Sequence, residues 1–238
     1  MLAMFYSSVV YAIFTATFVY AIGFIGNISV ARPLDGAATS EPATALAVDL
    51  LLLAIFAMQH SVMARKGFKS WWTKIVPPVV ERSTYVLAAS VALFALCWFW
   101  QPIEGTVWSV KDPAAVVTLQ CIFWLGWGVL FAATLLIDHF ELFGLAQPFR
   151  ALLGHKPAPQ EFRTPGLYRY VRHPIYFGFV VGMWAAPEMS LGHLLFAAGG
   201  TGYILVGIWF EERDLIAHFG DRYRAYRKQV PMLIPGRR

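Results

Sequence analysis

Ionisable side chains stand at the ends of several long apolar stretches, and these residues have the clearest chemical potential. They come from separate parts of the chain: His60; Asp138, His139 and Glu141; Arg172 and His173; Glu211 and Glu212. A charged group beside an apolar segment is costly, so it marks either a functional site or a paired structural contact. Groups of both signs at one depth could form an ion-pair network or bind a polar, zwitterionic ligand. The convergence of so many groups favours the ligand.

The same residues lack the spacing of a metal site. No two of the 6 histidines stand three or four residues apart, and no acidic side chain completes a zinc pattern. Cys97 and Cys121 lie in predicted spans, where cysteine usually acts as a small apolar filler. We therefore expect no bound metal.

The elements that must position these groups are membrane-spanning helices. The composition is 58% hydrophobic and only 14% charged, which is outside the range of soluble domains. A span needs about 20 apolar residues, because only a helix satisfies its own backbone where water is absent. Four segments meet this length: 1–31, 44–64, 83–103 and 113–137. A longer stretch, 174–210, is interrupted by Pro187 and Glu188, and predicts a helical hairpin with a turn at 187–190 and a short first arm.

The distribution of basic residues predicts which side of the membrane carries the ionisable groups. Of the 19 Lys and Arg residues, only Arg32 and Lys111 lie in the alternate loops; the rest fall in 65–82, 138–173 and the tail after Glu212. Cytoplasmic loops carry the excess of Lys and Arg, so both termini are expected in the cytoplasm. The predicted fold class is all-α: a polytopic transmembrane helical bundle of five or six spans, including the C-terminal hairpin.

The C-terminal tail predicts one further helix over 211–230. Apolar and aromatic side chains recur there at helical spacing, opposite a basic face. Such an amphipathic helix can lie on the membrane or cover a cytoplasmic site.

The net charge of +5 borders the spans and forms no single stripe, which indicates membrane lipids with anionic headgroups as partners and no nucleic acid. No linker separates soluble domains, so we expect one membrane domain, 1–238.

Two linked motifs near the C-terminus resemble a known superfamily. The first is Tyr-Arg-Tyr-Val-Arg-His-Pro-Ile-Tyr-Phe-Gly at 168–178, and the second runs from Glu-Glu-Arg-Asp-Leu at 211–215 to Ile234 and Pro235. Together they resemble the membrane methyltransferases of the isoprenylcysteine carboxyl methyltransferase and phospholipid methyltransferase superfamily. The signal is specific, because the two motifs flank a hairpin of the expected length.

Within that superfamily, segments at 59–65, 81–86, 139–144 and 192–197 are most similar to a bacterial subgroup that methylates the small thiol methanethiol to dimethyl sulfide. The resemblance implies an inner-membrane enzyme that uses S-adenosylmethionine, with 138–238 as its cofactor-binding part. Two alternatives stay open: a methyltransferase for a lipid or prenylcysteine carboxylate, and a non-enzymatic membrane subunit that keeps the fold.

The resemblance also implies the cofactor-contacting residues His173, Pro174, Tyr176, Gly178, Glu211 and Glu212. Arg172 or Arg169 could hold the cofactor carboxylate, while the two glutamates suit its ammonium or ribose hydroxyls. Gly178 would let the cofactor approach the backbone. Four tyrosines could offer an aromatic face to the adenine or the sulfonium: Tyr168, Tyr176, Tyr223 and Tyr226.

Methylation of a thiol adds a need for a base. The thiolate is the reactive form, and a simple alkyl thiol is mostly protonated near neutral pH. His139 and His60 are the best candidate bases, because imidazole titrates nearest neutrality. Asp138 or Glu141 could orient one of them. An enzyme without a dedicated base stays possible, since the cationic sulfonium itself stabilises a thiolate.

Overall fold

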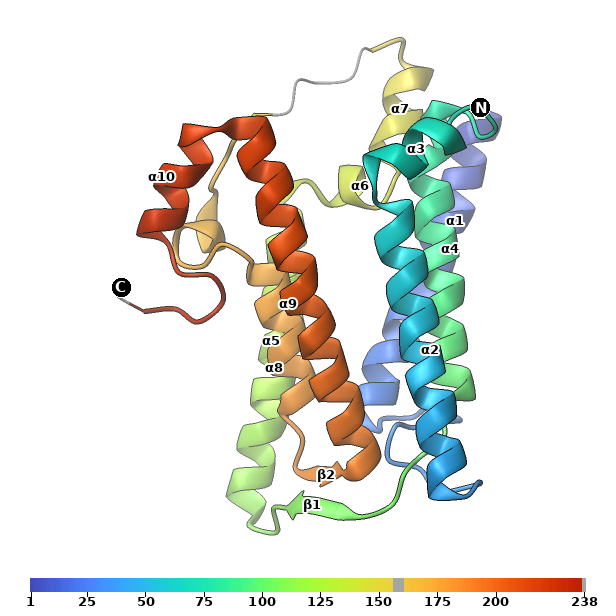
Figure 1. The fold of residues 1–238 in the computed structure, drawn as a ribbon, viewed down its shortest axis with the longest axis vertical. Coiled ribbons are helices and arrows are strands. Elements are labelled where there is room, and N and C mark those ends of the chain that lie inside the picture. The colour runs from blue at the N-terminus through green and yellow to red at the C-terminus, as the bar shows by residue number, and fades with distance from the viewer. Residues whose placement is uncertain (156–160, 237–238) are drawn as a thin grey trace. The chain divides into compact units, whose positions relative to one another are not determined.

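The computed structural model describes residues 1–155 and 161–236. Within these ranges five helices are long and apolar enough to cross a membrane: α1 (Leu2–Gly26), α2 (Pro42–Met63), α4 (Pro78–Phe99), α5 (Pro113–Ile137) and α9 (Leu191–Phe219). Figure 1 shows that the ribbon is almost entirely helical. The predicted all-α, multi-span class is confirmed.

Short elements connect the long helices. They are α3 (Lys66–Trp72), β1 (Thr106–Ser109), α6 (His139–Leu142), α7 (Ala146–Leu152), the 3-10 turn η1 (Gly166–Arg169), α8 (Pro174–Trp184), β2 (Glu188–Ser190) and α10 (Asp221–Gln229). Proline begins α2, α4, α5 and α8, where its missing N–H leaves no helical hydrogen bond unmade. The strands β1 and β2 pair with each other.

Large apolar side chains cover the outside of the long helices. Leu51 is 59% exposed, Leu125 64% and Trp124 53%. Only 6% of the most apolar window of α2 is buried inside the protein. Exposure of so much apolar surface to water would be unfavourable, whereas contact with lipid tails is not. The chain is a multi-pass membrane protein.

The C-terminal hairpin has arms of very different length. Helix α8 contains 11 residues, or about 16 Å at 1.5 Å per residue, which is half of a bilayer core of about 30 Å. Helix α9 contains 29 residues and exceeds that thickness. The turn of the hairpin lies between Trp184 and Leu191, where the proline at 187 predicted a turn. It contains the short strand β2. The described residues therefore contain five helices long enough to span the membrane and one short hairpin arm, α8.

The predicted tail helix over 211–230 is divided into two helices. Helix α9 continues through Glu211 and Glu212 to Phe219, and α10 begins at Asp221. Gly220 separates them with φ +57°, a backbone conformation that side chains disfavour. The two glutamates therefore stand inside the last turns of a long helix, and do not begin a separate amphipathic one.

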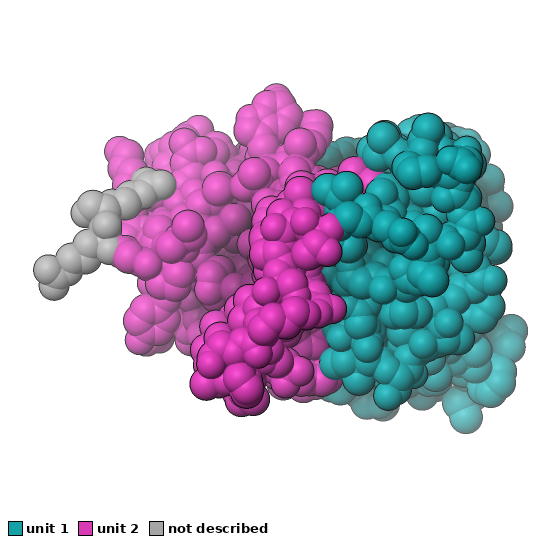
Figure 2. All heavy atoms as spheres, turned by 90° about the horizontal axis from the view of Figure 1, so that it is seen from below, with its two compact units in different colours: residues 1–105, 139–158, 190–193 teal, residues 106–138, 159–189, 194–238 magenta. Residues whose placement is uncertain are grey.

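The chain forms two compact units that interleave along the sequence, drawn in two colours in Figure 2. Unit 1 comprises residues 1–105, 139–158 and 190–193, and unit 2 comprises 106–138, 159–189 and 194–238. Each unit has its own internal contacts.

Unit 1 is built on the packing of α1 against α4. Its core contains Val10, Tyr85 and Val86. Ser7 and Ser83 share a 2.7 Å hydrogen bond between the helices, and Ser83 also donates to the Gly144 carbonyl at 2.8 Å. A Cβ atom on Gly144, which has φ +85°, would lie 2.7 Å from the Ser83 nitrogen. The segment after α5 therefore docks on α4 only because glycine stands there.

Asp35 of unit 1 makes polar contacts with Ser190 and His193 at the start of α9. Asp35 Oδ1 accepts a hydrogen bond from Ser190, and Asp35 Oδ2 lies 2.8 Å from His193 Nδ1. Burial alone would raise the pKa of Asp35, but the hydrogen bond and charge of His193 outweigh it and lower that pKa. The carboxylate is thus ionised near neutral pH, and the buried His193 acquires a partner.

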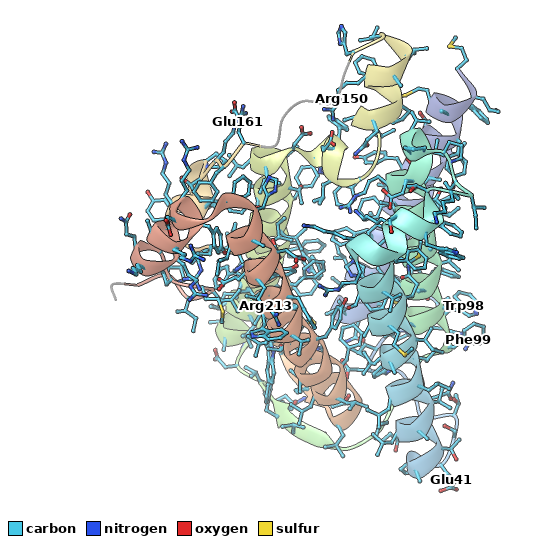
Figure 3. All side chains as sticks on the ribbon, turned by 45° about the horizontal axis from the view of Figure 1, so that its top comes forward. Glu41, Trp98, Phe99, Arg150, Glu161 and Arg213 are labelled. Atoms are coloured by element: carbon cyan, nitrogen blue, oxygen red, sulfur yellow. The ribbon has the colours of Figure 1, made fainter. Side chains whose placement is uncertain are left out.

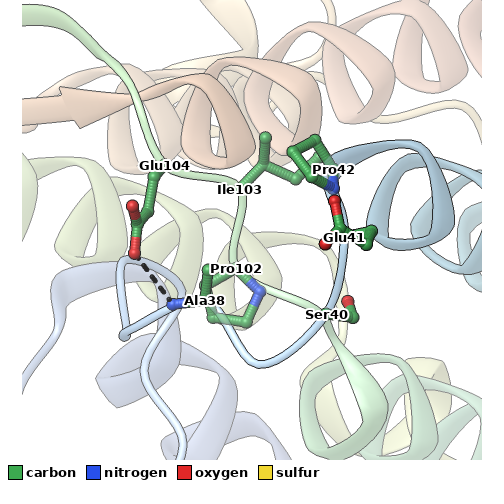
Figure 4. Close-up of a pocket in the computed structure, with 7 residues that line it drawn as sticks. All are labelled: Ala38, Ser40, Glu41, Pro42, Pro102, Ile103 and Glu104. Atoms are coloured by element: carbon green, nitrogen blue, oxygen red, sulfur yellow. Dashed lines mark hydrogen bonds between the residues drawn. The ribbon is translucent and has the colours of Figure 1, made fainter.

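Unit 1 also has a cavity of about 250 Å³, shown in Figure 4, at the end of α2 that begins with Pro42. Its lining comes from the loops before α2 and after α4, including Glu41 and Glu104. Glu104 points toward the Ala38 N–H, which donates to its carboxylate at 3.4 Å. His60 stands at the opposite end of α2, so this cavity is remote from that candidate base.

Unit 2 is built on the close packing of α5 against α8. A Cβ atom on Gly178 would lie 2.6 Å from the Gly126 carbonyl, and one on Gly126 would lie 2.9 Å from the Gly178 carbonyl. Small residues allow two helix backbones to touch, which is the main source of helix association in lipid. The two glycines are therefore steric requirements of this packing.

We expect Gly126→Ala to lower the stability of unit 2 by about 1–3 kcal/mol, because the added methyl group overpacks the α5–α8 contact. Gly128→Ala is a matched control on the same helix, since a Cβ there meets nothing within 4 Å. Thermal unfolding in detergent measures both. Equal melting temperatures for the two variants would contradict the packing account.

Candidate functional site

Arg172, His173 and Glu212 form a buried charged cluster in unit 2. Arg172 Nε donates to Glu212 Oε1 at 2.7 Å, and His173 Nε2 lies 3.2 Å from the same oxygen. The side chains of Arg172, His173 and Glu212 are 4%, 3% and 11% exposed. The sequence predicted that these residues would meet, and within unit 2 they do.

The local sequence explains how the cluster is assembled. His173 directly precedes Pro174, which begins α8, and it has φ −128° and ψ 64°. A residue before proline is disfavoured in helical backbone, so Arg172 and His173 stay outside the helix. Glu212 comes from α9, after the turn that closes the hairpin. The hairpin returns the chain to the level at which α8 began.

Arg172 also fixes the C-terminal segment. Its Nη1 atom donates to the carbonyls of Arg227 at 3.1 Å and Val230 at 2.5 Å, and its backbone N–H donates to the Pro231 carbonyl at 2.9 Å. These bonds satisfy a buried guanidinium that would otherwise be unstable. Arg172 therefore positions the site, and the prediction that it holds a cofactor carboxylate stays untested.

Two accessible charges flank the buried cluster. Glu211 Oε2 lies 3.8 Å from His173 Nδ1 with its side chain 44% exposed, and Arg227 Nη1 lies 3.6 Å from Glu212 Oε2 with its side chain 48% exposed. They place one accessible negative group and one accessible positive group beside the cluster. The sequence analysis missed Arg227, whose position on the basic face of the tail gave no separate signal.

Aromatic side chains pack beside the cluster. The Tyr176 ring lies 5.6 Å from the His173 ring, and the Tyr226 hydroxyl donates to the Tyr168 carbonyl at 2.5 Å. Burial raises the pKa of Tyr226 to about 12, so that hydroxyl keeps its proton. Phe162 contacts the rings of Tyr223 and Tyr226.

The Tyr223 hydroxyl is buried without a hydrogen-bond partner among the described residues. The whole residue is 2% exposed. Burial raises the pKa of Tyr223, and the charges of Glu212 and Arg172 also act on it, so the hydroxyl stands within the field of the cluster. A buried hydroxyl with no partner costs about 1–3 kcal/mol, which a bound ligand could recover.

Pro174 and Gly178 have structural contacts in unit 2. Pro174 is fully buried at the start of α8, and Gly178 lies against Gly126 of α5. The close approach that the sequence assigned to a cofactor at Gly178 is made by a neighbouring helix. A cofactor contact at either residue stays a prediction.

The candidate bases His139 and His60 lie in unit 1. His139 is 7% exposed, and its Nε2 atom lies 2.7 Å from the Tyr11 hydroxyl of α1. His60, in the last turn of α2, packs against the rings of Phe56 and Tyr85. Tyr11 carried no signal in the sequence, because a tyrosine in a charge-free span is indistinguishable from apolar packing.

The carboxylates predicted to orient a base have other surroundings. Asp138 is exposed in unit 2 and has φ +130°, which ends α5 abruptly. Glu141 pairs with Arg150 of α7, labelled in Figure 3, and accepts a hydrogen bond from Gln147 at 3.0 Å. Throughout 1–155 and 161–236, no group of three or more His, Cys, Asp or Glu residues could hold a metal ion.

The fold and the buried cluster define a multi-pass membrane protein whose C-terminal hairpin carries a charged, aromatic-lined site. No family model and no solved structure matches the chain. The chain is 53% identical over 234 residues to a methanethiol S-methyltransferase of Mycobacterium tuberculosis (strain ATCC 25618 / H37Rv), covering 98% of this chain and 96% of that protein.

Two further relatives extend the comparison. Methanethiol S-methyltransferase 1 of Bradyrhizobium diazoefficiens is 51% identical, covering 100% of this chain and 83% of the relative. Nurim of Sus scrofa is 30% identical over 182 residues, covering 71% of this chain and 68% of that protein. The chain belongs to the methanethiol S-methyltransferase family.

We expect Arg172→Met to destabilise the protein by about 3–5 kcal/mol, because it leaves Glu212 as a buried, partly compensated charge and releases the Val230 carbonyl. Arg169→Met is the control, since Arg169 is exposed and its loss should cost less than about 0.5 kcal/mol. Thermal unfolding in detergent compares them. A similar melting temperature for both variants would show that the buried pair is dispensable.

Proposed function

We propose that this chain is an S-adenosylmethionine-dependent enzyme that methylates methanethiol to dimethyl sulfide in the bacterial inner membrane. The substrate assignment rests on the names of relatives that align with nearly the whole chain. The observation that carries the cofactor assignment is the Arg172, His173 and Glu212 cluster beside the Tyr223 hydroxyl, which lacks a partner among the described residues. We further propose one domain, 1–238, with 138–238 as its cofactor-binding part and both termini in the cytoplasm.

The chemical groups around the cluster fit S-adenosylmethionine. The cofactor would supply a methyl group on a positively charged sulfur. Glu211 can accept hydrogen bonds from its ammonium or ribose, and Arg227 can hold its carboxylate. The Tyr176 ring offers an aromatic face to a cation or to adenine. His173, Glu212 and Arg172 hold these groups in place, and Tyr223 contributes a hydrogen bond.

The chain must also prepare the thiol. Methyl transfer requires the sulfur to approach the methyl carbon opposite the breaking bond, so orientation supplies much of the acceleration. Burial lowers the pKa of His139, so its imidazole is neutral at pH 7 and has a lone pair. We propose that this lone pair takes the thiol proton, leaving the S–H bonding pair on sulfur as the nucleophile. His60 is the alternative base, and Asp138 is the candidate for orienting one of the two imidazoles.

The test is formation of dimethyl sulfide from methanethiol and S-adenosylmethionine by the purified protein, measured by headspace gas chromatography. His173→Ala should abolish most product by weakening cofactor binding about 10-fold or more, the effect of one hydrogen bond to a charged group. His218→Ala is the matched control, because His218 is exposed on the same helix as Glu212. Cofactor binding without product would indicate a lipid or carboxylate acceptor, and absence of both would indicate a non-enzymatic subunit.

Tyr223→Phe tests the cofactor site separately from the reaction. It removes only the hydroxyl that lacks a partner among the described residues, so the melting temperature of the ligand-free protein should not fall. Affinity for S-adenosylhomocysteine should fall about 3- to 10-fold, as measured by calorimetry. Unchanged affinity would remove Tyr223 from the site.

A further inference from the structure

Tyr11 contacts His139, the proposed base, through its hydroxyl group and its ring. The Tyr11 hydroxyl lies 2.7 Å from His139 Nε2, and the two rings meet edge to face with centroids 5.8 Å apart. The residues are 128 positions apart in sequence, so this contact is a product of tertiary structure. It joins α1 of unit 1 to the segment that follows α5.

Aromatic rings enclose the rest of the imidazole. The Phe143 and Phe140 rings contact His139 at 4.8 and 5.4 Å, and Phe14 of α1 stacks on Phe143 at 4.1 Å. These rings carry no charge, so they hold the imidazole without offering it a proton acceptor. The Tyr11 hydroxyl adds a polar contact from α1.

Two arginines on nearby elements have other partners. Arg82 Nε of α4 donates to the Leu142 carbonyl at 2.7 Å, and Arg150 of α7 pairs with Glu141. Asp138, the residue before His139, is exposed. The hydroxyl of Tyr11 is a neutral hydrogen-bond partner of the imidazole.

A neutral imidazole has one N–H donor and one acceptor nitrogen, and the partner of one nitrogen fixes the role of the other. If Tyr11 donated to Nε2, the ring proton would be on Nδ1 and His139 could not take a proton there. If Nε2–H donates to the Tyr11 oxygen, Nδ1 carries the lone pair. Only the second arrangement makes His139 a base.

We propose that Tyr11 is a positioning residue for His139: its oxygen accepts the Nε2–H hydrogen bond and so selects Nδ1 as the proton-accepting nitrogen. When the thiol proton moves to Nδ1, its bonding pair stays on sulfur and the ring becomes an imidazolium. The Nε2–H group remains bound to the Tyr11 oxygen, which stabilises that cation. The inference rests on the proposed function, since it gives His139 the role of base.

The experiment compares Tyr11→Phe with Tyr6→Phe in the full-length protein. Both tyrosines are on α1, and the Tyr6 hydroxyl bonds to Thr84 at 3.1 Å. We expect Tyr11→Phe to lower kcat for methanethiol about tenfold, the effect of one hydrogen bond to a charged group, with the affinity for S-adenosylhomocysteine unchanged. The acidic limb of the kcat profile should move to lower pH, because the imidazolium loses an acceptor. Tyr6→Phe should match the wild type.

Two further measurements isolate the role. The double variant with His139→Ala should be no slower than His139→Ala alone, because Tyr11 acts only through that ring. Nitrogen NMR of labelled histidine should find the proton of neutral His139 on Nε2 in the wild type. A proton on Nδ1, a limb that moves to higher pH, or wild-type kcat in Tyr11→Phe would overturn the inference.

The outcomes separate this inference from the function it rests on. A slow His139→Ala variant with a fast Tyr11→Phe variant would overturn only the role of Tyr11. A fast His139→Ala variant would overturn both the base and its positioning residue. Absence of dimethyl sulfide from the wild type would overturn the proposed function itself.

Discussion

A charged side chain in apolar surroundings is stable only when other groups of the protein replace water, and in unit 2 that constraint is met by Arg172 and Glu212. The guanidinium cannot lose its proton, so every donor that is buried must find an acceptor. Its partners come from α9 and from the last residues after α10. The bonds of Arg172 thus fix where the hairpin returns and where the segment directly after α10 lies.

This arrangement separates the buried charges of the cluster from the accessible charges beside it. Arg172 donates to Glu212 and to two backbone carbonyls, and the same Glu212 oxygen lies 3.2 Å from His173, so both charges are already paired inside the protein. Glu211 and Arg227 stand next to them, half exposed. A buried network holds these accessible charges in place, so a zwitterionic ligand of the kind we propose would bind with little loss of side-chain entropy.

Unit 1 meets the same constraint with neutral and partly charged contacts. Ser83 joins α1 and the loop after α6, and Asp35 supplies a partner for the buried His193. Tyr11 does the same for His139. Each contact links residues far apart in sequence, so each contributes to a single packed arrangement as well as satisfying a polar atom.

The sequence by itself determined the membrane class and the approximate positions of the spans, and it named Arg172, His173 and Glu212 of the charged cluster, because these depend on apolar length and on two local motifs. The start of α5 at Pro113 and its end at Ile137 are as predicted, since Pro, Asp138 and apolar composition are local signals. Only the tertiary structure decided the partners. A Cβ atom on Gly178 would lie 2.6 Å from the Gly126 carbonyl, Arg172 donates to the Val230 carbonyl, and Tyr11 binds His139, because these contacts depend on which helices pack together. Sequence spacing along one helix carries no information about that choice.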